Sequence, residues 1–385
     1  MRDGLAPLLF SRAVVWAAGV PAVLALGTSS SGWRARADPT NITGTLGSVG
    51  HVVGAPVMRW DSVYYVQVAN DGYTQAKQAG FFPLYPYVIG FLGAPIVTGA
   101  LLSLVAFAAA LVLFDRLTVL ETGDALVARR AVWLLALFPA SLFFSAVYTE
   151  ALFLLLSVGS FYAARQGRWA WAGVLGGAAA MTRNVGVMLL VPLVILYLWG
   201  PREDRSGRRG RFALRADALW LLLVPAGCAL VAALMWHKFD DPFTAWTSQE
   251  SYFGREFKGP FSGVVLGAIK PFDDLAAGHL GGFVNKGALF VVCAGALGVA
   301  VASFKRLPVA YGAYAIAALA PALSTPRDIG PLNGSIRYVA VVFPLFLWLA
   351  LALQRRRRAY LALCAIFTLG LAYCSVRFAT WRWVA

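Results

Sequence analysis

Apolar runs of about 20 residues recur along almost the whole chain with only short polar breaks, and this pattern constrains the fold more than any other feature. A helix needs about 20 apolar residues to cross roughly 30 Å of hydrocarbon, where backbone polar groups must be satisfied within the segment. Because 59% of the residues are hydrophobic and only 13% are charged, a water-soluble domain of this length is excluded. The sequence therefore predicts one all-α membrane domain, a polytopic helical bundle over residues 1–385.

We expect about eleven transmembrane helices, each read from an apolar run. Two of the polar segments, 29–93 and 237–283, are long for connections in a compact bundle, and long structured loops more often bind or react than merely connect. In the first loop we expect amphipathic helices on the membrane surface. The expected spans lie near residues 7–28, 94–115, 127–147, 150–165, 169–186, 187–200, 217–236, 284–304, 308–325, 338–353 and 359–376.

A net charge of +15 raises the question of nucleic-acid binding, but the positions of the basic residues argue against it. The two densest basic runs, 202–215 and 355–358, directly follow apolar spans, as cytoplasmic stop signals do. We therefore expect no nucleic-acid partner. In this orientation, in the cell membrane, the N-terminus is cytoplasmic, whereas both long loops and the C-terminus lie outside. The tripeptide Ala35-Arg36-Ala37 resembles a small-residue signal-peptide cleavage site but lies too far past the first apolar run, which favours a retained anchor.

The first long loop contains the best candidate for chemistry. Trp60, Tyr64 and Val68 are spaced i, i+4 and i+8, which predicts one stripe of a helix on the membrane surface. Asp61 lies at the expected start of that helix, and Gly72 at its end. Farther on, Phe81-Phe82-Pro83-Leu84-Tyr85-Pro86 carries two prolines, which predict an extended, rigid approach to the next span.

Two interpretations of Asp61 remain open from the residues themselves. In the first, Asp61 caps the helix while the neighbouring aromatic residues form a membrane-interface belt. In the second, Asp61 is a general base, because an ionised carboxylate beside an aromatic wall can accept a proton from an attacking hydroxyl. Any carboxylate chemistry is expected on the outer face, where most acidic residues fall in the proposed orientation.

Three further charged residues lie at expected outer helix ends. Glu150 follows Tyr148-Thr149, and Arg183 follows Thr182; these two either form an ion pair within the bundle or contact substrate. Arg337 follows a turn at Asn333-Gly334-Ser335, where it either binds an anion or extends towards the interface. The adjacent aspartates at 240–241 and 273–274 point to opposite sides of an extended chain, so we predict no metal site.

Several motifs together resemble one known family. The chain contains Arg59-Trp60-Asp61 with Tyr64, then Val68-Ala69, Gly72-Tyr73 and Phe81-Phe82-Pro83 with Pro86. Weaker motifs follow in order: Phe138-Pro139, Tyr148-Thr149-Glu150, Thr182-Arg183 with Gly186, and Arg337-Tyr338 with Phe343-Pro344. Over roughly residues 55 to 350, this arrangement resembles the PIG-V family, the second mannosyltransferase of glycosylphosphatidylinositol assembly and its bacterial relatives.

The resemblance implies a GT-C type glycosyltransferase. Such enzymes take a sugar, usually mannose, from a polyprenyl phosphate and transfer it with inversion on the outer face, using a first-loop aspartate as the base. Asp61 matches that aspartate and Trp60 matches its neighbour, whereas Asp71 has no assigned place in the pattern. We expect no cofactor beyond the lipid-linked donor; membrane lipids are partners, and the extracytoplasmic lipid, glycan or protein acceptor is not identified. The expected substrate-binding residues are Arg59, Trp60, Tyr64, Asp71, Tyr73, Tyr148, Glu150, Arg183, Arg337 and Tyr338.

The alternative function is a lipid or small-molecule transporter or flippase. A transporter predicts ionisable residues near the middle of spans and helices broken by glycine or proline in matching halves. In this sequence the carboxylates cluster at outer ends and in loops, which favours the enzyme.

Overall fold

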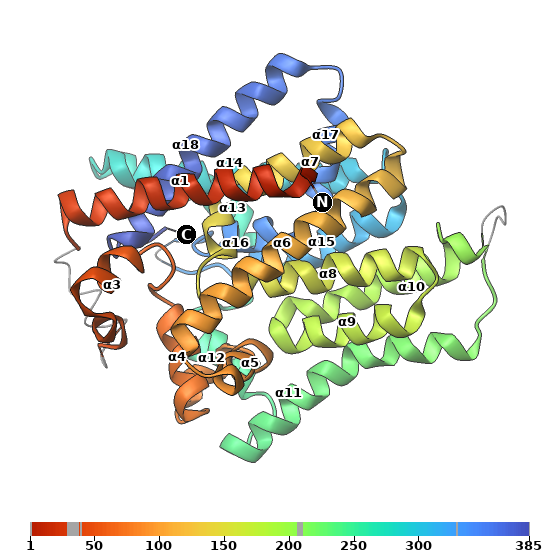
Figure 1. The fold of residues 1–385 in the computed structure, drawn as a ribbon, viewed down its shortest axis with the longest axis horizontal. Helices are drawn as coiled ribbons and strands as arrows, with labels where there is room; N and C mark the ends of the chain where they lie inside the picture. The colour runs from red at the N-terminus through yellow and green to blue at the C-terminus, as the bar shows by residue number, and fades with distance from the viewer. Residues whose placement is uncertain (1, 29–37, 39–40, 206–210, 329, 385) are drawn as a thin grey trace. The chain divides into compact units, whose positions relative to one another are not determined.

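The computed structural model describes residues 2–28, 38, 41–205, 211–328 and 330–384, and within these ranges the chain is helical without a β-strand (Figure 1). The all-α prediction is confirmed. The tripeptide Ala35-Arg36-Ala37 and the centre of the arginine-rich run, 206–210, lie outside the described residues. The helices are α1 (Arg2–Leu26), η1 (Ile42–Leu46), α3 (Gly47–Val53), α4 (Ser62–Asp71), η2 (Ala76–Gly80), α5 (Leu84–Leu92), α6 (Pro95–Thr122), α7 (Ala125–Leu137), η3 (Pro139–Phe144), α8 (Glu150–Arg165), α9 (Trp169–Thr182), η4 (Asn184–Leu189), α10 (Leu190–Trp199), η5 (Glu203–Arg205), η6 (Ala216–Leu222), α11 (Leu223–Phe239), α12 (Thr244–Ser251), α13 (Ser262–Ala276), α14 (Leu280–Ser303), α15 (Val309–Ser324), α16 (Ser335–Val341), α17 (Pro344–Ala352) and α18 (Arg357–Ala379).

The chain divides into two compact units, which are described separately below. Unit 1 comprises Met1–Thr74, Phe81–Val158 and Leu349–Val384. Unit 2 comprises Gln75–Gly80 and Gly159–Trp348. The prediction of a single domain over 1–385 stays a prediction.

Among the described residues, five helices are long and apolar enough to cross a membrane, which confirms a polytopic membrane protein. Helices α16 and α17 form a sixth span if they are counted together, although they are bent by 72° relative to each other. Each of the other expected spans coincides with a helix that is shorter or broken. For example, the run at 127–147 breaks where α7 ends and Pro139 begins η3, because proline cannot continue the backbone hydrogen bonding of the preceding helix. The five long helices are Gly4–Leu26, Pro95–Thr122, Ala216–Phe239, Leu280–Ser303 and Arg357–Ala379.

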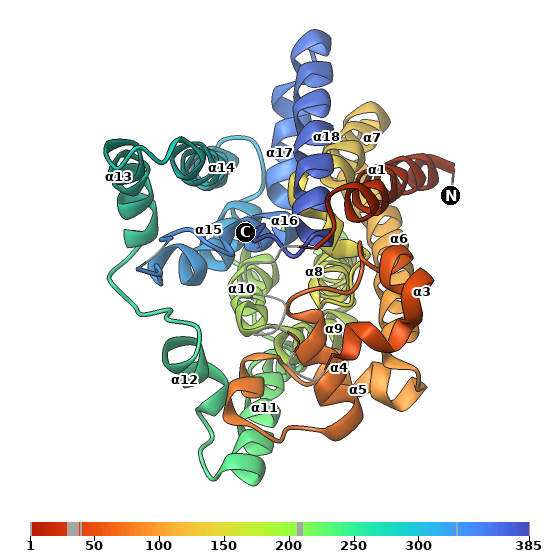
Figure 2. The same ribbon diagram turned by 90° about the vertical axis from the view of Figure 1, so that its left-hand side faces the viewer.

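In unit 1, helices α1, α6, α7 and α18 pack against one another (Figure 2). Arg12, in the middle of α1, is buried in this packing and donates hydrogen bonds to η3. Its Nη1 donates to the Ser141 carbonyl at 2.8 Å and to the Ser145 hydroxyl at 2.7 Å, while its Nη2 donates to the Ser141 hydroxyl at 3.0 Å. Its Cζ lies 5.1 Å from the ring centroid of Phe107. These contacts compensate for removing the charge from water.

The first long loop of unit 1 folds into α3, α4 and α5, so the prediction of helices in this segment is confirmed. Gly72 ends α4 as predicted, and its N–H donates to the Val68 carbonyl at 3.0 Å. The predicted extended approach after Phe82 is wrong, because α5 begins at Leu84 and includes Pro86. Proline is accepted in the first turn of a helix, where the backbone N–H groups have no intrahelical partner.

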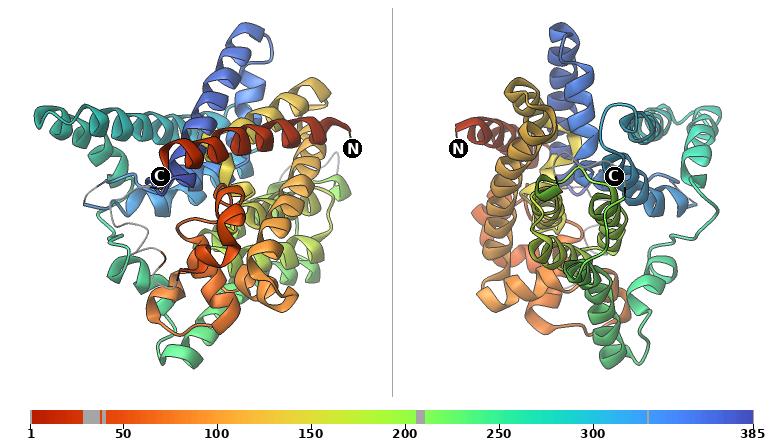
Figure 3. Two further views of the ribbon diagram at one scale, coloured as in Figure 1. Left: turned by 60° about the vertical axis from the view of Figure 1, so that its left-hand side comes forward. Right: turned by 90° about the vertical axis from the view of Figure 1, so that its right-hand side faces the viewer.

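In unit 2, α9 packs closely against α11, and glycine makes this approach possible. A Cβ atom at Gly227 of α11 would lie 2.3 Å from the carbonyl oxygen of Gly177 in α9. Small residues of this kind let membrane helices come into backbone contact. In the same unit, α13 and α14, drawn in teal, form a helical hairpin that Figure 3 shows in two further views.

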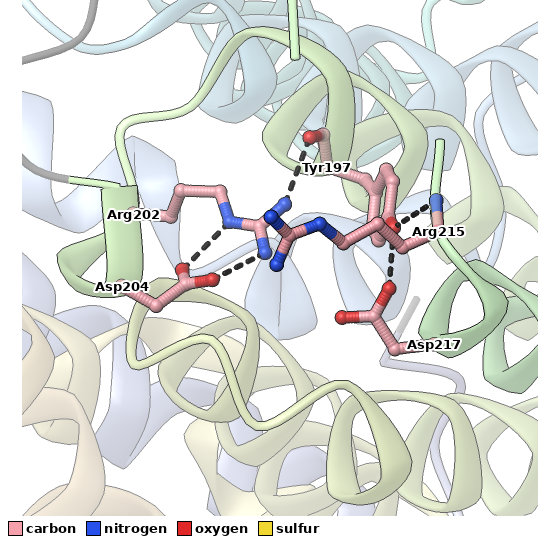
Figure 4. A network of polar contacts seen from close by, with 5 residues as sticks. All are labelled: Tyr197, Arg202, Asp204, Arg215 and Asp217. Atoms are coloured by element: carbon pink, nitrogen blue, oxygen red, sulfur yellow. Dashed lines mark hydrogen bonds and ion pairs between the residues drawn. The ribbon is translucent and has the colours of Figure 1, made fainter. Parts of the chain in front are cut away.

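The start of the arginine-rich segment folds back onto the end of α10 in unit 2 (Figure 4). The guanidinium of Arg202 is paired with Asp204, with Nε 2.7 Å from the carboxylate, and its Nη1 donates to the Tyr197 carbonyl at 3.0 Å. The Tyr197 hydroxyl donates to Asp217 and accepts the Arg215 N–H at 3.1 Å. The basic run expected to set topology therefore also has a defined local structure on both sides of 206–210.

Candidate active site

Arg59 begins the first-loop turn, residues 59–61, and its side chain is fully buried in unit 1. Its Nη1, Nε and Nη2 donate to the carbonyls of Met58, Ala379 and His51 at 2.8, 3.1 and 3.2 Å, respectively. Its Cζ lies 5.3 Å from the ring centroid of Trp381. Because these partners compensate for burying the charge, Arg59 links the first-loop turn to the end of α18. Its predicted contact with substrate stays a prediction.

Trp60 lies at the centre of the first-loop turn and adopts a left-handed backbone conformation, with φ +57°. Its ring packs against Trp381 and Trp383, with centroid distances of 5.6 and 5.1 Å. The predicted surface stripe is therefore wrong at this residue, because α4 begins only at Ser62 and Trp60 lies outside the helix. The remaining two members are on α4, where Val68 is buried and Tyr64 is half-buried.

Asp61 is the N-cap residue of α4, as predicted, but its carboxylate makes no capping hydrogen bond with the first turn. Asp61 has helical backbone angles, φ −60° and ψ −20°, whereas a capping side chain reaches its target from an extended backbone. The Asp61 amide donates to the Tyr148 hydroxyl at 3.1 Å, and that hydroxyl donates to the Arg59 carbonyl at 3.1 Å. Tyr148 thus holds the backbone on both sides of Trp60. The half-buried Asp61 carboxylate does not cap the start of α4.

An aromatic wall lies along α4. Tyr64 stacks on Phe81 with ring centroids 4.8 Å apart, and Tyr65 meets the same ring edge-on at 5.1 Å. The Tyr65 hydroxyl lies 3.2 Å from the Thr149 hydroxyl, directly before Glu150, which begins α8 and is fully buried. The structure therefore brings the predicted residues Asp61, Tyr64, Tyr148 and Glu150 into one part of unit 1.

Two predicted residues lie at the far end of α4. Asp71 is the last residue of that helix and is exposed. Tyr73 is buried, and its hydroxyl donates to the Phe81 carbonyl. Burial raises the pKa of Tyr73 well above its usual value, so the phenol stays protonated and serves as a donor at neutral pH. Tyr73 therefore fixes the chain that carries the Phe81 ring.

In unit 2, two arginines converge on one aromatic ring. Arg183 follows α9 and is buried, with its Cζ 5.0 Å from the ring centroid of Tyr338. The Cζ of Arg255, which lies beyond α12, is 5.6 Å from the same centroid. The Nη2 of Arg255 also donates to the Asn333 carbonyl at 3.1 Å. Two guanidinium groups near one ring create a positively charged site for an anion.

Arg255 was missed by the sequence analysis. It makes no ion pair within the described ranges, and the neighbouring Glu256 pairs instead with Lys258 at 3.6 Å. Gly334 makes room for it: this residue has φ +85°, and a Cβ atom there would lie 2.5 Å from the Arg255 Nη2. The signal that could have found the site was the Asn333-Gly334 turn, which the sequence analysis connected with Arg337 instead.

The predicted Arg337 is half-buried on α16, directly before Tyr338. Adjacent residues of a helix project about 100° apart, so Arg337 and Tyr338 leave α16 in different directions. Across the part of the chain that the structure describes, no three His, Cys, Asp or Glu side chains gather into a set that could hold a metal ion.

Comparisons with known proteins agree with the motifs. The family described as Mannosyltransferase (PIG-V) matches residues 47–195. GPI mannosyltransferase 2 of Drosophila pseudoobscura pseudoobscura is 33% identical over 108 residues, which cover 24% of this chain and 24% of that protein. GPI mannosyltransferase 2 of Yarrowia lipolytica (strain CLIB 122 / E 150) is 28% identical over 138 residues, which cover 35% of this chain and 39% of that protein.

The similarity therefore extends over less than half the length of either relative. The segment that matches the family, residues 47–195, contains the first-loop turn. That segment includes Asp61, Tyr148, Glu150 and Arg183, whereas Arg255 and the end of α18 lie outside it. The resemblance found in the sequence is confirmed for this segment: residues 47–195 match the PIG-V mannosyltransferase family.

Proposed function

We propose that this protein is an inverting glycosyltransferase that moves a hexose, foremost mannose, from a polyprenyl-phosphate donor to a hydroxyl of an extracytoplasmic lipid, glycan or protein. One observation carries the proposal: the segment related to PIG-V proteins contains Asp61, a half-buried carboxylate at a helix start that it does not cap. The names of the two relatives support mannose as the sugar. The membrane helices suit a lipid-linked donor.

Asp61 is the proposed general base. It accepts the proton of the attacking acceptor hydroxyl while the oxygen forms a bond to the anomeric carbon of the hexose. The bond between that carbon and the phosphate oxygen breaks, and its electron pair leaves with the phosphate. A single displacement of this kind inverts the configuration of the anomeric carbon.

Arg183 and Arg255 are the proposed partners of the phosphate. Both contact the ring of Tyr338, and guanidinium groups form charge-assisted hydrogen bonds with phosphate oxygens. Phosphate leaves readily when its charge is compensated, so the reaction needs no second catalytic acid. Arg337 is retained as a third candidate phosphate ligand, and Tyr64, Asp71, Tyr73 and Glu150 are retained as candidate substrate contacts.

A transporter or flippase is the alternative, and Arg12 is a mid-span charge that this function could use. Its contacts favour a structural role, because Ser141 and Ser145 accept hydrogen bonds from its guanidinium.

We also propose a cytoplasmic N-terminus in the cell membrane. Reporter tags at position 207, outside the described residues, and at the C-terminus should then lie inside and outside, respectively. Tags on one side would overturn the eleven-span orientation.

The activity is tested by incubating purified protein with labelled polyprenyl-phosphate mannose and a membrane extract, and then identifying the labelled product. We expect label on an acceptor and release of polyprenyl phosphate. Movement of intact labelled donor across a proteoliposome membrane without release would instead favour the flippase.

The base is tested by comparing Asp61→Asn with Asp61→Ala. Asparagine keeps the shape of aspartate but cannot accept the proton, so transfer should fall by roughly 10²-fold or more while the folded fraction is unchanged. Because Asn caps helices about as well as Asp, a capping role predicts instead an active Asn variant and an Ala variant that loses about 1 kcal/mol of stability. Full transfer by folded Asp61→Asn protein would refute the assignment.

A further inference from the structure

The end of α18 and the residues after it meet the first-loop turn within unit 1. We call residues 379–383 the C-terminal clamp. They lie outside the segment related to PIG-V proteins, so the comparisons assign them no role. Three independent contacts nevertheless join the C-terminal clamp to the tripeptide that carries Asp61.

The first contact is through Arg59. Its Nε donates to the Ala379 carbonyl at 3.1 Å, and its Cζ lies 5.3 Å from the Trp381 ring centroid. The side chains of Arg59 and Trp381 are both fully buried. A buried guanidinium requires partners that compensate for its lost hydration, and the C-terminal clamp supplies two of them, the Ala379 carbonyl and the Trp381 ring.

The second and third contacts are through Trp60. Its left-handed backbone, at φ +57°, is an uncommon and strained conformation for a bulky residue. Such a conformation persists where the surroundings favour it strongly, and here Trp381 and Trp383 pack on its ring at 5.6 and 5.1 Å. The C-terminal clamp therefore helps to hold the backbone that directly precedes Asp61.

The C-terminal clamp is itself ordered by hydrogen bonds. The Trp381 N–H donates to the Phe378 carbonyl at 3.2 Å, and the Arg382 N–H donates to the Arg377 carbonyl at 2.8 Å. The Arg377 Nε donates to the Trp383 carbonyl at 2.8 Å. A segment with this much internal bonding can fix the position of the groups it contacts.

We propose that the C-terminal clamp positions the catalytic base: Trp381 is a positioning residue that holds Arg59 and Trp60 so that the Asp61 carboxylate meets the acceptor hydroxyl. This inference rests on the proposed glycosyltransferase function. Displacement of a reacting group by about 1 Å can reduce a rate as much as 10²-fold, so loss of the Trp381 ring should affect turnover more than donor binding.

The test compares Trp381→Ala with Trp381→Phe and with Trp171→Ala. Trp171 is a large exposed side chain on α9 in unit 2, so its replacement controls for the loss of a tryptophan. We expect Trp381→Ala to lower kcat at least tenfold with the donor KM nearly unchanged, and Trp381→Phe to recover most of the loss. The control should behave like the original protein. Unchanged kcat in folded Trp381→Ala protein, or an equal loss in the control, would overturn the proposal.

A second measurement does not depend on transfer activity. Hydrogen exchange followed by mass spectrometry should show faster exchange over residues 59–66 in Trp381→Ala than in the original protein and the Trp171→Ala control. Unchanged exchange would overturn the positioning role whatever the activity. If the original protein transfers no sugar but the exchange difference is present, the proposed function fails while the link between the C-terminal clamp and the first-loop turn stands.

Discussion

Arg59 in unit 1 and Arg255 in unit 2 both lie near an aromatic ring, yet their surroundings differ. Arg59 is fully buried, and three of its nitrogens donate to carbonyl groups. Arg255 is half-buried, and of its side-chain nitrogens only Nη2 donates to a described residue of the protein. An arginine whose donors are used by the protein stabilises the fold, whereas one with donors to spare can bind an anion. The same residue type therefore serves structure in one region and, as we propose, substrate in the other.

The largest expected difference between the two arginines is in stability. Arg59→Ala removes a donor from three carbonyls, two of them buried, and should cost about 3 kcal/mol or more in the free energy of unfolding. Arg255→Ala removes one hydrogen bond at a half-buried site and should cost about 1 kcal/mol or less. Unfolding of the purified variants in detergent measures both. Equal losses would remove the distinction between the two sites.

For donor binding we expect the reverse order, with a larger effect at Arg255 than at Arg59. Arg255→Ala and Arg183→Ala should each raise the KM for the polyprenyl-phosphate donor by roughly tenfold or more, because each removes a charge-assisted contact with phosphate. Lysine should restore the function only in part, since it lacks the planar fork. Steady-state kinetics at fixed acceptor concentration is the measurement. A donor KM that is unchanged in both folded Ala variants would contradict phosphate binding by Arg183 and Arg255 and indicate a structural role.

Gly334 offers a smaller change at the same site. In Gly334→Ala, the new Cβ would lie 2.5 Å from the Arg255 Nη2, and the backbone at φ +85° would be strained by about 1 kcal/mol. We expect Arg255 to shift and the donor KM to rise about threefold to fivefold. Gly298→Ala on α14 is the control, because nothing lies within 4 Å of its added Cβ. A donor KM equal to that of the control would contradict the role of Gly334.

The smallest expected effect comes from the ring shared by the two arginines. Tyr338→Leu removes a cation–π partner worth about 0.5–1 kcal/mol at a partly exposed site, so the donor KM should rise by about twofold to fivefold. Tyr338→Phe keeps the ring and should retain more of the donor affinity than Leu. Phe and Leu variants with the same kinetics would show that the ring does not organise the two guanidinium groups.

The helical fold could be predicted well because an apolar run is visible in a short stretch of sequence and does not depend on distant residues. Each expected span coincides with a helix, but only five helices among the described residues reach membrane length unbroken. Asp61 and Gly72 were placed correctly, since helix ends have local signals. Pro86 was misread because proline fits both an extended segment and the first turn of α5.

Contacts between distant segments could not be predicted in this way. Arg59 and Ala379 are 320 positions apart, and no periodicity connects them. Trp60 was assigned to a helical stripe because its spacing fitted one, although its backbone is left-handed and its ring packs on the C-terminal clamp. Arg255 lies in a loop whose charged neighbours are typical of a solvated surface, and only the fold places it beside Tyr338.

The burial of Arg12 also bears on the order in which the protein assembles in the membrane. An arginine near the centre of a membrane helix costs about 2.5–3.5 kcal/mol during insertion. In the finished protein Ser141 and Ser145 compensate for it, yet the ribosome makes them 129 and 133 residues later. The guanidinium of Arg12 can therefore obtain these hydrogen bonds only after η3 and Ser145 have been synthesised and have packed against α1.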